Sequence, residues 1–204
     1  MKDWVKGRVV AKRQWNHRLF SMQFDAPVAD FKAGQFTQVA LDIGEERVGR
    51  PYSLVNAPQE RPLEIYFNAI PEGPLTPRLS DLSPGDEVWI ASTASGVFTL
   101  DAMPAARDLW LIATGTALGV YLSILRTPDP WERFERVLLV HGVRSSDELT
   151  YGDTLGALRD AHGERFSFVP VLSRERREGI LHGRIPPLLV SGDLEARAGI
   201  AIEA

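Results

Sequence analysis

The sequence contains four adjacent residues with complementary binding chemistry, Arg50, Pro51, Tyr52 and Ser53, at the end of a strand-like stretch. An arginine offers a phosphate a fixed fork of donors, and a tyrosine offers a flat face to a fused ring. A serine adds a hydroxyl that can hydrogen-bond to a ring nitrogen. These residues therefore predict a site for a ligand that joins a fused aromatic ring to phosphate, as a flavin nucleotide does.

A second segment with phosphate-binding chemistry follows further along the chain and consists of Gly73, Pro74, Leu75, Thr76 and Pro77. Thr76 is a favoured N-cap residue and Pro77 suits the first helical turn, so a short helix is predicted over residues 77–82. A helix start attracts phosphate because its free N–H groups and its dipole point toward the anion. One ring site and two phosphate sites suit a dinucleotide such as FAD.

The first half of the chain has the pattern of short strands separated by turns. Rough alternation of apolar and polar residues marks residues 5–11, 19–24, 35–41, 63–67 and 87–90. Turns are expected at residues 31–34 and 83–86. This arrangement predicts an antiparallel β-barrel over residues 1–100 that holds the FAD, followed by a linker at residues 101–106.

The second half has a different pattern, in which compact apolar runs alternate with helix-like stretches. The runs are residues 109–113, 137–141 and 166–172, and the stretches are residues 120–126 and 153–161. Buried strands alternating with helices predict an α/β domain with a parallel sheet over residues 107–204. In such a sheet, ligands bind beyond the carboxyl ends of the strands.

Three predicted strands in this half end in residues suited to a phosphorylated nucleotide. A glycine turn, residues 114–119, follows the first run, Arg144 follows the second, and Ser173 and Arg174 follow the third. Each signal alone has a plain structural alternative. Tyr52 can be a core aromatic residue, and the two arginines can be ordinary surface charges. Their common placement at strand ends favours the nucleotide site.

Composition and charge narrow the classes of function. A net charge of -4 and a pI near 5.6 argue against a general nucleic-acid binder. The absence of cysteine excludes disulfide and thiolate chemistry in these residues. No apolar run approaches the roughly 20 residues that a membrane helix needs. The histidines, His17, His141, His162 and His182, lack metal-ligand spacing. We expect a cytoplasmic protein with no metal site and no membrane partner.

Five segments, taken together, resemble the motifs of the bacterial ferredoxin/flavodoxin–NADP(+) reductases. They are residues 50–53, 73–79, 113–117, 140–144 and 172–175. The resemblance runs from Trp4 to near the end of the chain. It implies FAD on the barrel and NADP(H) on the α/β domain.

By this resemblance, Arg50 would bind the FAD pyrophosphate and Tyr52 would pack on the isoalloxazine ring. Ser53 would hydrogen-bond near the flavin N5, which makes it the candidate catalytic residue. The remaining implied FAD-binding residues are Pro51, Tyr66, Gly73, Pro74, Leu75 and Thr76.

The resemblance also implies the residues of the NADP(H) site. Thr116 would lie where the flavin and the nicotinamide meet. Arg144, Ser173, Arg174 and Arg184 would hold the NADP phosphates. Arg174 and Arg184 would bind the 2′-phosphate and so favour NADP over NAD.

The implied function is that of a monomeric FAD-dependent oxidoreductase that transfers electrons between NADP(H) and ferredoxin or flavodoxin. Two alternatives stay open at the level of sequence. One is an NAD(P)H-dependent flavin or ferric-chelate reductase on a similar scaffold, and the other is a non-catalytic flavin-binding module.

The end of the sequence departs from the family pattern. The family continues with another strand, a Cys-Gly-x-Pro motif and a carboxyl-terminal aromatic residue, whereas the sequence ends at Ala204. We therefore expect an incomplete NADP(H)-binding domain. The strand over residues 109–113 is then expected to have one open, apolar edge.

Overall fold

The computed structural model describes residues 3–202 and divides the chain into two compact units. One unit takes in the chain up to Met103 together with Gly119–Thr127. The other takes in Pro104–Leu118 and the chain from Pro128 onward. This grouping differs from contiguous domains over residues 1–100 and 107–204, because most of helix α2 (Leu118–Leu125) groups with the first unit.

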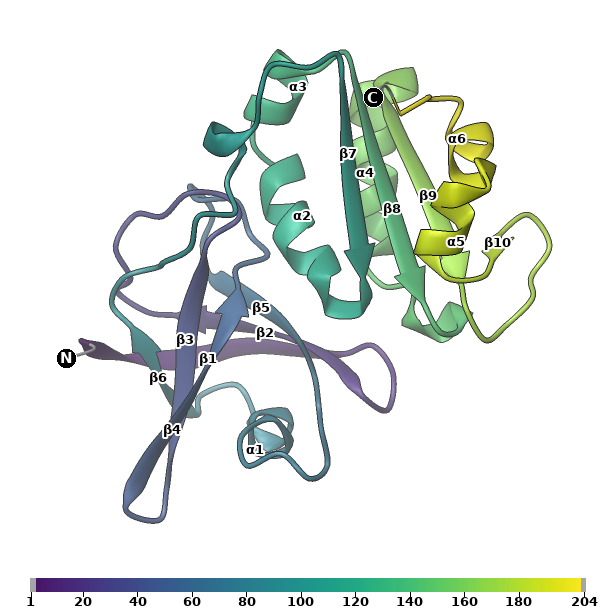
Figure 1. Ribbon diagram of the computed structural model, residues 1–204. Coiled ribbons are helices and arrows are strands. Elements are labelled where there is room, and N and C mark those ends of the chain that lie inside the picture. The colour runs from purple at the N-terminus through teal and green to yellow at the C-terminus, as the bar shows by residue number, and fades with distance from the viewer. Residues whose placement is uncertain (1–2, 203–204) are drawn as a thin grey trace. The chain divides into compact units, whose positions relative to one another are not determined.

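The first unit contains a six-stranded sheet in which all paired strands are antiparallel (Figure 1). Its strands are β1 (Trp4–Gln14), β2 (Leu19–Asp25), β3 (Phe36–Ile43), β4 (Glu46–Ser53), β5 (Leu63–Asn68) and β6 (Glu87–Ala91). They lie in the order β4-β3-β6-β1-β2-β5. A bridge between Leu54 and Ile65 joins the ends of the first and last strands in this order, so the predicted antiparallel barrel is confirmed.

The barrel core follows from strict alternation along the strands. Successive side chains in a strand point to opposite faces, so every second residue faces the interior. Phe20, Met22 and Phe24 of β2 are all buried in the core, and so are Leu63 and Ile65 of β5. The same periodicity that identified the strands in the sequence therefore fills the barrel.

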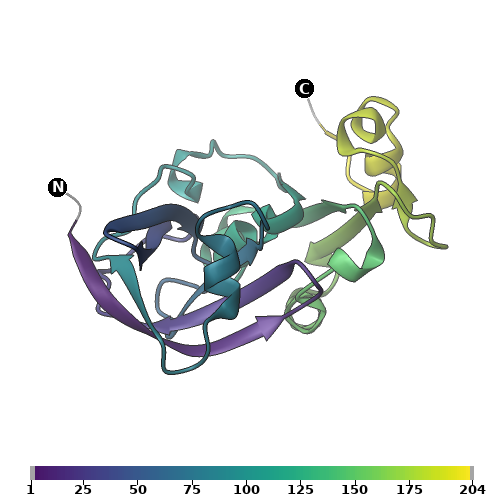
Figure 2. The same cartoon turned by 90° about the horizontal axis from the view of Figure 1, so that it is seen from below.

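The second unit contains a parallel sheet of four strands, which confirms the predicted α/β architecture. The strands are β7 (Asp108–Thr114), β8 (Arg136–Val143), β9 (Phe166–Leu172) and β10 (Leu181–His182). The helices are α3 (Asp129–Arg133), α4 (Gly152–His162), α5 (Ile185–Val190) and α6 (Asp193–Ala198). Figure 2 shows the green α4 on one side of these strands and the yellow α5 and α6 on the other.

Several short elements were not predicted from the sequence. They are α3, α5, α6, β10 and the 3₁₀ turns η1 (Leu100–Ala102), η2 (Gly115–Ala117), η3 (Ser146–Glu148) and η4 (Gly163–Arg165). Each is too short to show a helical or alternating period, and α3 and α5 carry proline in their first turn. The 3₁₀ turn η1 also occupies the start of the predicted linker.

Strand β7 lies at the edge of the parallel sheet, whose order is β10-β9-β8-β7. Its residues Leu109, Leu111 and Ala113 are buried. Among the described residues, β7 therefore pairs with a neighbouring strand on one side only, and these three side chains are covered. Asp108, the first residue of β7, accepts two hydrogen bonds from Arg136, at 2.7 and 2.6 Å, which tie β7 to β8.

Residues 3–202 contain neither a helix suited to span a membrane nor a cluster of metal-binding side chains. No helix there combines the length and the apolar character needed to cross a membrane. No group of three or more histidine, cysteine, aspartate or glutamate residues in that span could hold a metal ion.

Candidate functional site

The Arg50–Ser53 motif occupies the last four residues of β4, which pairs with β3. Because side chains alternate along a strand, Arg50 and Tyr52 share one face of β4. Arg50 is exposed, and its Nη1 donates to the carbonyl of Gly49 at 2.8 Å. The rest of its guanidinium fork is available to an anion.

Tyr52 combines a packed ring with a hydroxyl that has no partner. The ring packs against the barrel core and meets Phe67 edge-on, with 6.1 Å between the ring centroids. Its hydroxyl is buried and makes no hydrogen bond within the described residues. Buried polar groups nearly always have a partner, so this hydroxyl indicates a ligand atom that the protein does not supply. Burial raises the pKa of Tyr52 to about 12, against a smaller lowering by the charge of Arg50.

This raised pKa predicts that the ligand-free protein becomes less stable at alkaline pH. A tyrosine with a pKa of 10.0 when unfolded and about 12 when folded stabilises the fold fully below pH 10. That contribution is lost as the pH rises toward 12. The tyrosinate absorbance of the parent protein minus that of Tyr52→Phe should show this late ionisation. A difference curve centred near pH 10 would contradict the burial of the hydroxyl.

Ser53 is the last residue of β4, opposite Phe36 of β3. The side chain is half-buried, and its hydroxyl makes no hydrogen bond to any described residue. It can therefore donate a hydrogen bond to a ligand or accept one. Pro51 is exposed beside it.

The second predicted segment leads into helix α1 (Thr76–Asp81), with proline in the first turn as expected. The expectation that Thr76 is the N-cap was wrong: the N-cap is Leu75, and no side chain caps the helix. The Thr76 hydroxyl instead accepts the backbone N–H of Ile70 at 2.9 Å, and so holds the turn that precedes the helix. Gly73 closes the same turn by donating to the carbonyl of Ile70 at 2.8 Å.

The other two residues implied for the FAD site, Leu75 and Tyr66, are mostly buried. Leu75 is 1% exposed and packs in the barrel core, which leaves its backbone to meet a ligand. Tyr66 is buried on β5, where its Cβ lies close to Gly119 of α2.

Taken together, the first unit fits FAD. The orphaned hydroxyl of Tyr52, the unpaired hydroxyl of Ser53 and the exposed guanidinium of Arg50 lie within four residues of one strand. They offer a hydrogen-bond donor for a ribityl or phosphate oxygen, a group for a ring nitrogen and a cation for a diphosphate.

In the second unit, strand register brings the predicted arginines to one edge of the sheet. Leu172 of β9 pairs with His182 of β10, and the next bond runs from the Gly183 N–H to the Leu172 carbonyl at 2.9 Å. Arg174 and Arg184 each lie two positions beyond this pair, at the carboxyl ends of neighbouring parallel strands. Both side chains are exposed and make no ion pair or hydrogen bond within the described residues. Both are therefore available to a phosphate.

Arg144, by contrast, already has an anionic partner. Its Nε donates to Oε1 of Glu148 at 2.7 Å, and its backbone N–H donates to Oε2 at 3.0 Å. Burial raises the pKa of Glu148, but the hydrogen bonds from Arg144 outweigh it, so that the net pKa is lowered. This pair braces the turn after β8. Arg144 can offer a phosphate only the donors that Glu148 leaves unused.

The predicted glycine turn follows β7 as the 3₁₀ turn η2, with Gly115 at a φ of 52°, a conformation that suits glycine. Thr116 lies half-buried in this turn. The turn is held by His141 of β8, whose Nε2 lies 3.0 Å from the Gly115 carbonyl. Burial lowers the pKa of His141, and since a carbonyl only accepts, the neutral ring must carry its proton on Nε2.

Sequence reasoning did not assign roles to four residues that shape this unit: His141, Glu148, Glu175 and His182. His141 is fully buried and has a structural role, because it holds the glycine turn. The two glutamates gave no sequence signal, because an acidic residue near a phosphate site has no local pattern that marks it as a brace.

Comparison with known proteins agrees with this description of both units. The family model of the oxidoreductase NAD-binding domain matches residues 111–195. The flavodoxin/ferredoxin–NADP reductase of Escherichia coli is 45% identical over 98% of this chain and 81% of its own length. The ferredoxin–NADP reductase of Pseudomonas aeruginosa is 33% identical over 98% of this chain and 80% of its own length.

A solved structure gives the same result. The chain matches a ferredoxin NADP+ reductase from Neisseria gonorrhoeae with bound FAD and NADP at a TM-score of 0.93 and 29% identity. The match covers 100% of this chain and 82% of that one. With both half-sites built from the expected residue types and this similarity along nearly the whole sequence, the chain belongs to the flavodoxin/ferredoxin–NADP reductase family.

Proposed function

We propose that this protein is an FAD-dependent oxidoreductase that transfers electrons between NADP(H) and ferredoxin or flavodoxin. The 45% identity to a flavodoxin/ferredoxin–NADP reductase, over a stretch that contains every predicted site residue, carries the proposal. The related structure with bound FAD and NADP supports the choice of cofactors. Under this proposal residues 1–100 bind FAD and residues 107–204 bind NADP(H), joined by the linker at residues 101–106.

When bound, FAD supplies the redox chemistry, because it can take two electrons as a hydride from NADPH and release them singly to a one-electron carrier. The residues of the first unit bind and orient it. Arg50 neutralises the diphosphate, with backbone groups of Gly73, Pro74 and Leu75 and the hydroxyl of Thr76 beside it. Tyr52 packs on the isoalloxazine ring and gives its orphaned hydroxyl to the ligand.

Ser53 has the role closest to the chemistry. Its free hydroxyl would hydrogen-bond near the flavin N5, and so orient and polarise that part of the ring. Pro51 and Tyr66 line the same site, and Thr116 lies where the nicotinamide must approach. No strong acid or base is required of the protein.

In the second unit, Ser173, Arg174 and Arg184 bind the phosphates of NADP(H), and Arg144 contributes from its braced turn. The family resemblance assigns Arg174 and Arg184 to the 2′-phosphate, and their exposed, unpaired guanidinium groups are available for it. We also propose that the enzyme acts as a monomer in the cytoplasm, where NADPH is produced, without binding nucleic acid or a membrane.

The proposal is tested by mixing the FAD-loaded protein with NADPH in the absence of oxygen and following the flavin absorbance. The parent protein should bleach and then recover when oxidised ferredoxin or flavodoxin is added. Ser53→Ala should slow bleaching about tenfold to a hundredfold, since one assisting group near the reacting atom is lost. FAD content should stay unchanged. A yellow parent protein that NADPH does not bleach would reject the enzymatic function, and an unchanged rate in Ser53→Ala would remove Ser53 from the mechanism.

A further inference from the structure

The segment that links β9 to β10 carries an unusual concentration of free positive charge. Besides Arg174, it contains Arg176 and Arg177, and Arg184 follows just beyond β10; the side chains of all four are exposed and have no partner within the described residues. Like charges close together repel one another, and so favour a spread of conformations over a single ordered one. Something must hold this segment in place if its arginines are to meet a phosphate together.

Glu175 lies among these arginines, yet its carboxylate binds elsewhere. Its Oε2 accepts the backbone N–H of Ser146 at 2.7 Å, and its Oε1 accepts the Ser146 hydroxyl at 3.0 Å. Ser146 begins η3, just beyond the carboxyl end of β8. The carboxylate thus fastens the segment after β9 to the segment after β8.

The backbone of Glu175 makes a second link. Its carbonyl lies 2.8 Å from Nδ1 of His182, the last residue of β10. Because a carbonyl can only accept, Nδ1 carries the proton and donates it. Glu175, Ser146 and His182, which we call the Glu175 clamp, therefore connect the carboxyl ends of three adjacent strands.

We propose that Glu175 is a positioning residue that sets the preference of the enzyme for NADP(H) over NAD(H), acting through Arg174 and Arg184. This inference rests on the proposed function. The clamp fixes Glu175 at both its carboxylate and its carbonyl. Glu175 directly follows Arg174, and His182 lies two positions before Arg184. With the segment already ordered, less conformational entropy is lost when a 2′-phosphate binds.

Simple electrostatics makes the opposite prediction, which allows a clear test. If Glu175 acted only through its charge, its removal would strengthen the binding of a phosphate, because a nearby anion repels phosphate. If Glu175 acts as a clamp, its removal weakens that binding. NAD(H) lacks the 2′-phosphate, so its binding should not respond in either direction.

The experiment measures binding of 2′-phospho-AMP and of AMP to the FAD-loaded protein by calorimetry, with steady-state KM values for NADPH and NADH alongside. Glu175→Ala should weaken the binding of 2′-phospho-AMP about tenfold, because the charge-assisted hydrogen bonds that order the segment are lost. Glu175→Gln should stay within about threefold of the parent protein, since its amide can accept from the Ser146 N–H and donate to the Ser146 hydroxyl. The affinity for AMP, the KM for NADH and kcat should be unchanged in both variants.

Glu178→Gln is the matched control. Glu178 lies in the same segment, is exposed, and its side chain makes no hydrogen bond or ion pair within the described residues, so this change removes the same charge without touching the clamp. It should leave 2′-phospho-AMP binding unchanged or slightly stronger. If Glu175→Ala does not fold, His182→Ala tests the second link, with about threefold to tenfold weaker binding expected and recovery in His182→Asn, whose amide can donate in place of Nδ1.

Equal or tighter binding of 2′-phospho-AMP by Glu175→Ala would overturn the clamp, and so would parallel losses for 2′-phospho-AMP and AMP. The outcome is separate from that of the proposed function. A parent protein that discriminates between the two nucleotides upholds the NADP(H) site whatever Glu175 does, whereas a parent that binds neither rejects the site itself.

Discussion

Replacing Arg174 and Arg184 together with alanine should raise the KM for NADPH about a hundredfold to a thousandfold and leave the KM for NADH nearly unchanged. Each guanidinium is expected to form charge-assisted hydrogen bonds to the 2′-phosphate, worth about 1.5–3 kcal/mol apiece. A loss of about 1.4 kcal/mol weakens binding tenfold, so two losses near the lower end of that range, about 3–4 kcal/mol together, give the expected effect. Neither arginine side chain has another partner within residues 3–202, and alanine keeps the backbone hydrogen bonds of both positions, so the fold should not change.

Steady-state kinetics with both nucleotides, repeated at two salt concentrations, check this result. The preference for NADPH should also fall with added salt in the parent protein and not in the double variant, because salt screens exposed charge. Arg159→Ala is the control, because it removes one positive charge from the same unit. Arg159 is exposed on α4, and its side chain has no partner in the described residues. If the double variant raised the KM for NADPH and for NADH equally, the assignment of the 2′-phosphate site would be wrong.

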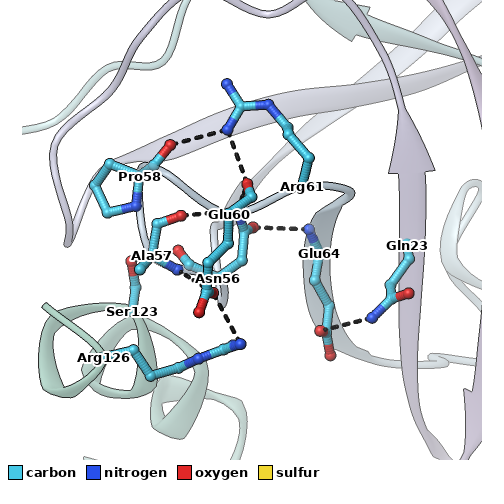
Figure 3. A network of polar contacts seen from close by, with 9 residues as sticks. All are labelled: Gln23, Asn56, Ala57, Pro58, Glu60, Arg61, Glu64, Ser123 and Arg126. Atoms are coloured by element: carbon cyan, nitrogen blue, oxygen red, sulfur yellow. Dashed lines mark hydrogen bonds and ion pairs between the residues drawn. The ribbon is translucent and has the colours of Figure 1, made fainter.

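Asn56→Ala should lower the free energy of unfolding by about 3 kcal/mol, because it removes three hydrogen bonds and leaves the buried N–H of Glu64 without this acceptor. Asn56 is 3% exposed. Its Nδ2 donates to the carbonyls of Ala57 and Glu60 at 3.1 and 2.9 Å, and its Oδ1 accepts the N–H of Glu64 at 2.9 Å (Figure 3). One side chain thus organises the whole connection between β4 and β5.

The same connection holds helix α2 within the first unit. The Ser123 hydroxyl donates to the Asn56 carbonyl at 2.8 Å, and Arg126 pairs with Glu60 at 2.8 Å, as Figure 3 shows. Displacing the connection should therefore loosen α2 as well. This accounts for the grouping of residues 119–127 with the barrel, which contiguous domain boundaries did not anticipate.

Urea unfolding of the FAD-loaded protein measures the effect of Asn56→Ala. Gln59→Ala is the matched control, since Gln59 is exposed in the same connection and makes no contact with a described residue. The control should change stability by less than about 0.5 kcal/mol, as surface substitutions usually do. A loss below about 1 kcal/mol in Asn56→Ala would show that water replaces the lost hydrogen bonds.

The architecture of both units could be predicted because it depends on local periodicity. Alternation along the strands of the first half and continuous apolar runs in the second are imposed by which faces of each sheet are buried. The motif at Arg50–Ser53 and the glycine turn at Gly115 were likewise visible, since each joins residue types that a single ligand needs at adjacent positions. What failed was local detail, such as the N-cap at Leu75, where the Thr76 hydroxyl found a partner in Ile70.

The sequence by itself determined the strand patterns, the order of the two units and the residue types at each strand end. Only the tertiary structure decided which of those residues are free to bind. It paired Arg144 with Glu148, left Arg174 and Arg184 without partners, orphaned the hydroxyl of Tyr52 and fastened Glu175 to Ser146. These outcomes depend on contacts such as Glu175 with Ser146, 29 positions apart, whose energy exists only once the strands have paired. Local sequence patterns do not reveal these contacts, because a charged residue looks the same in the sequence whether or not a distant partner neutralises it.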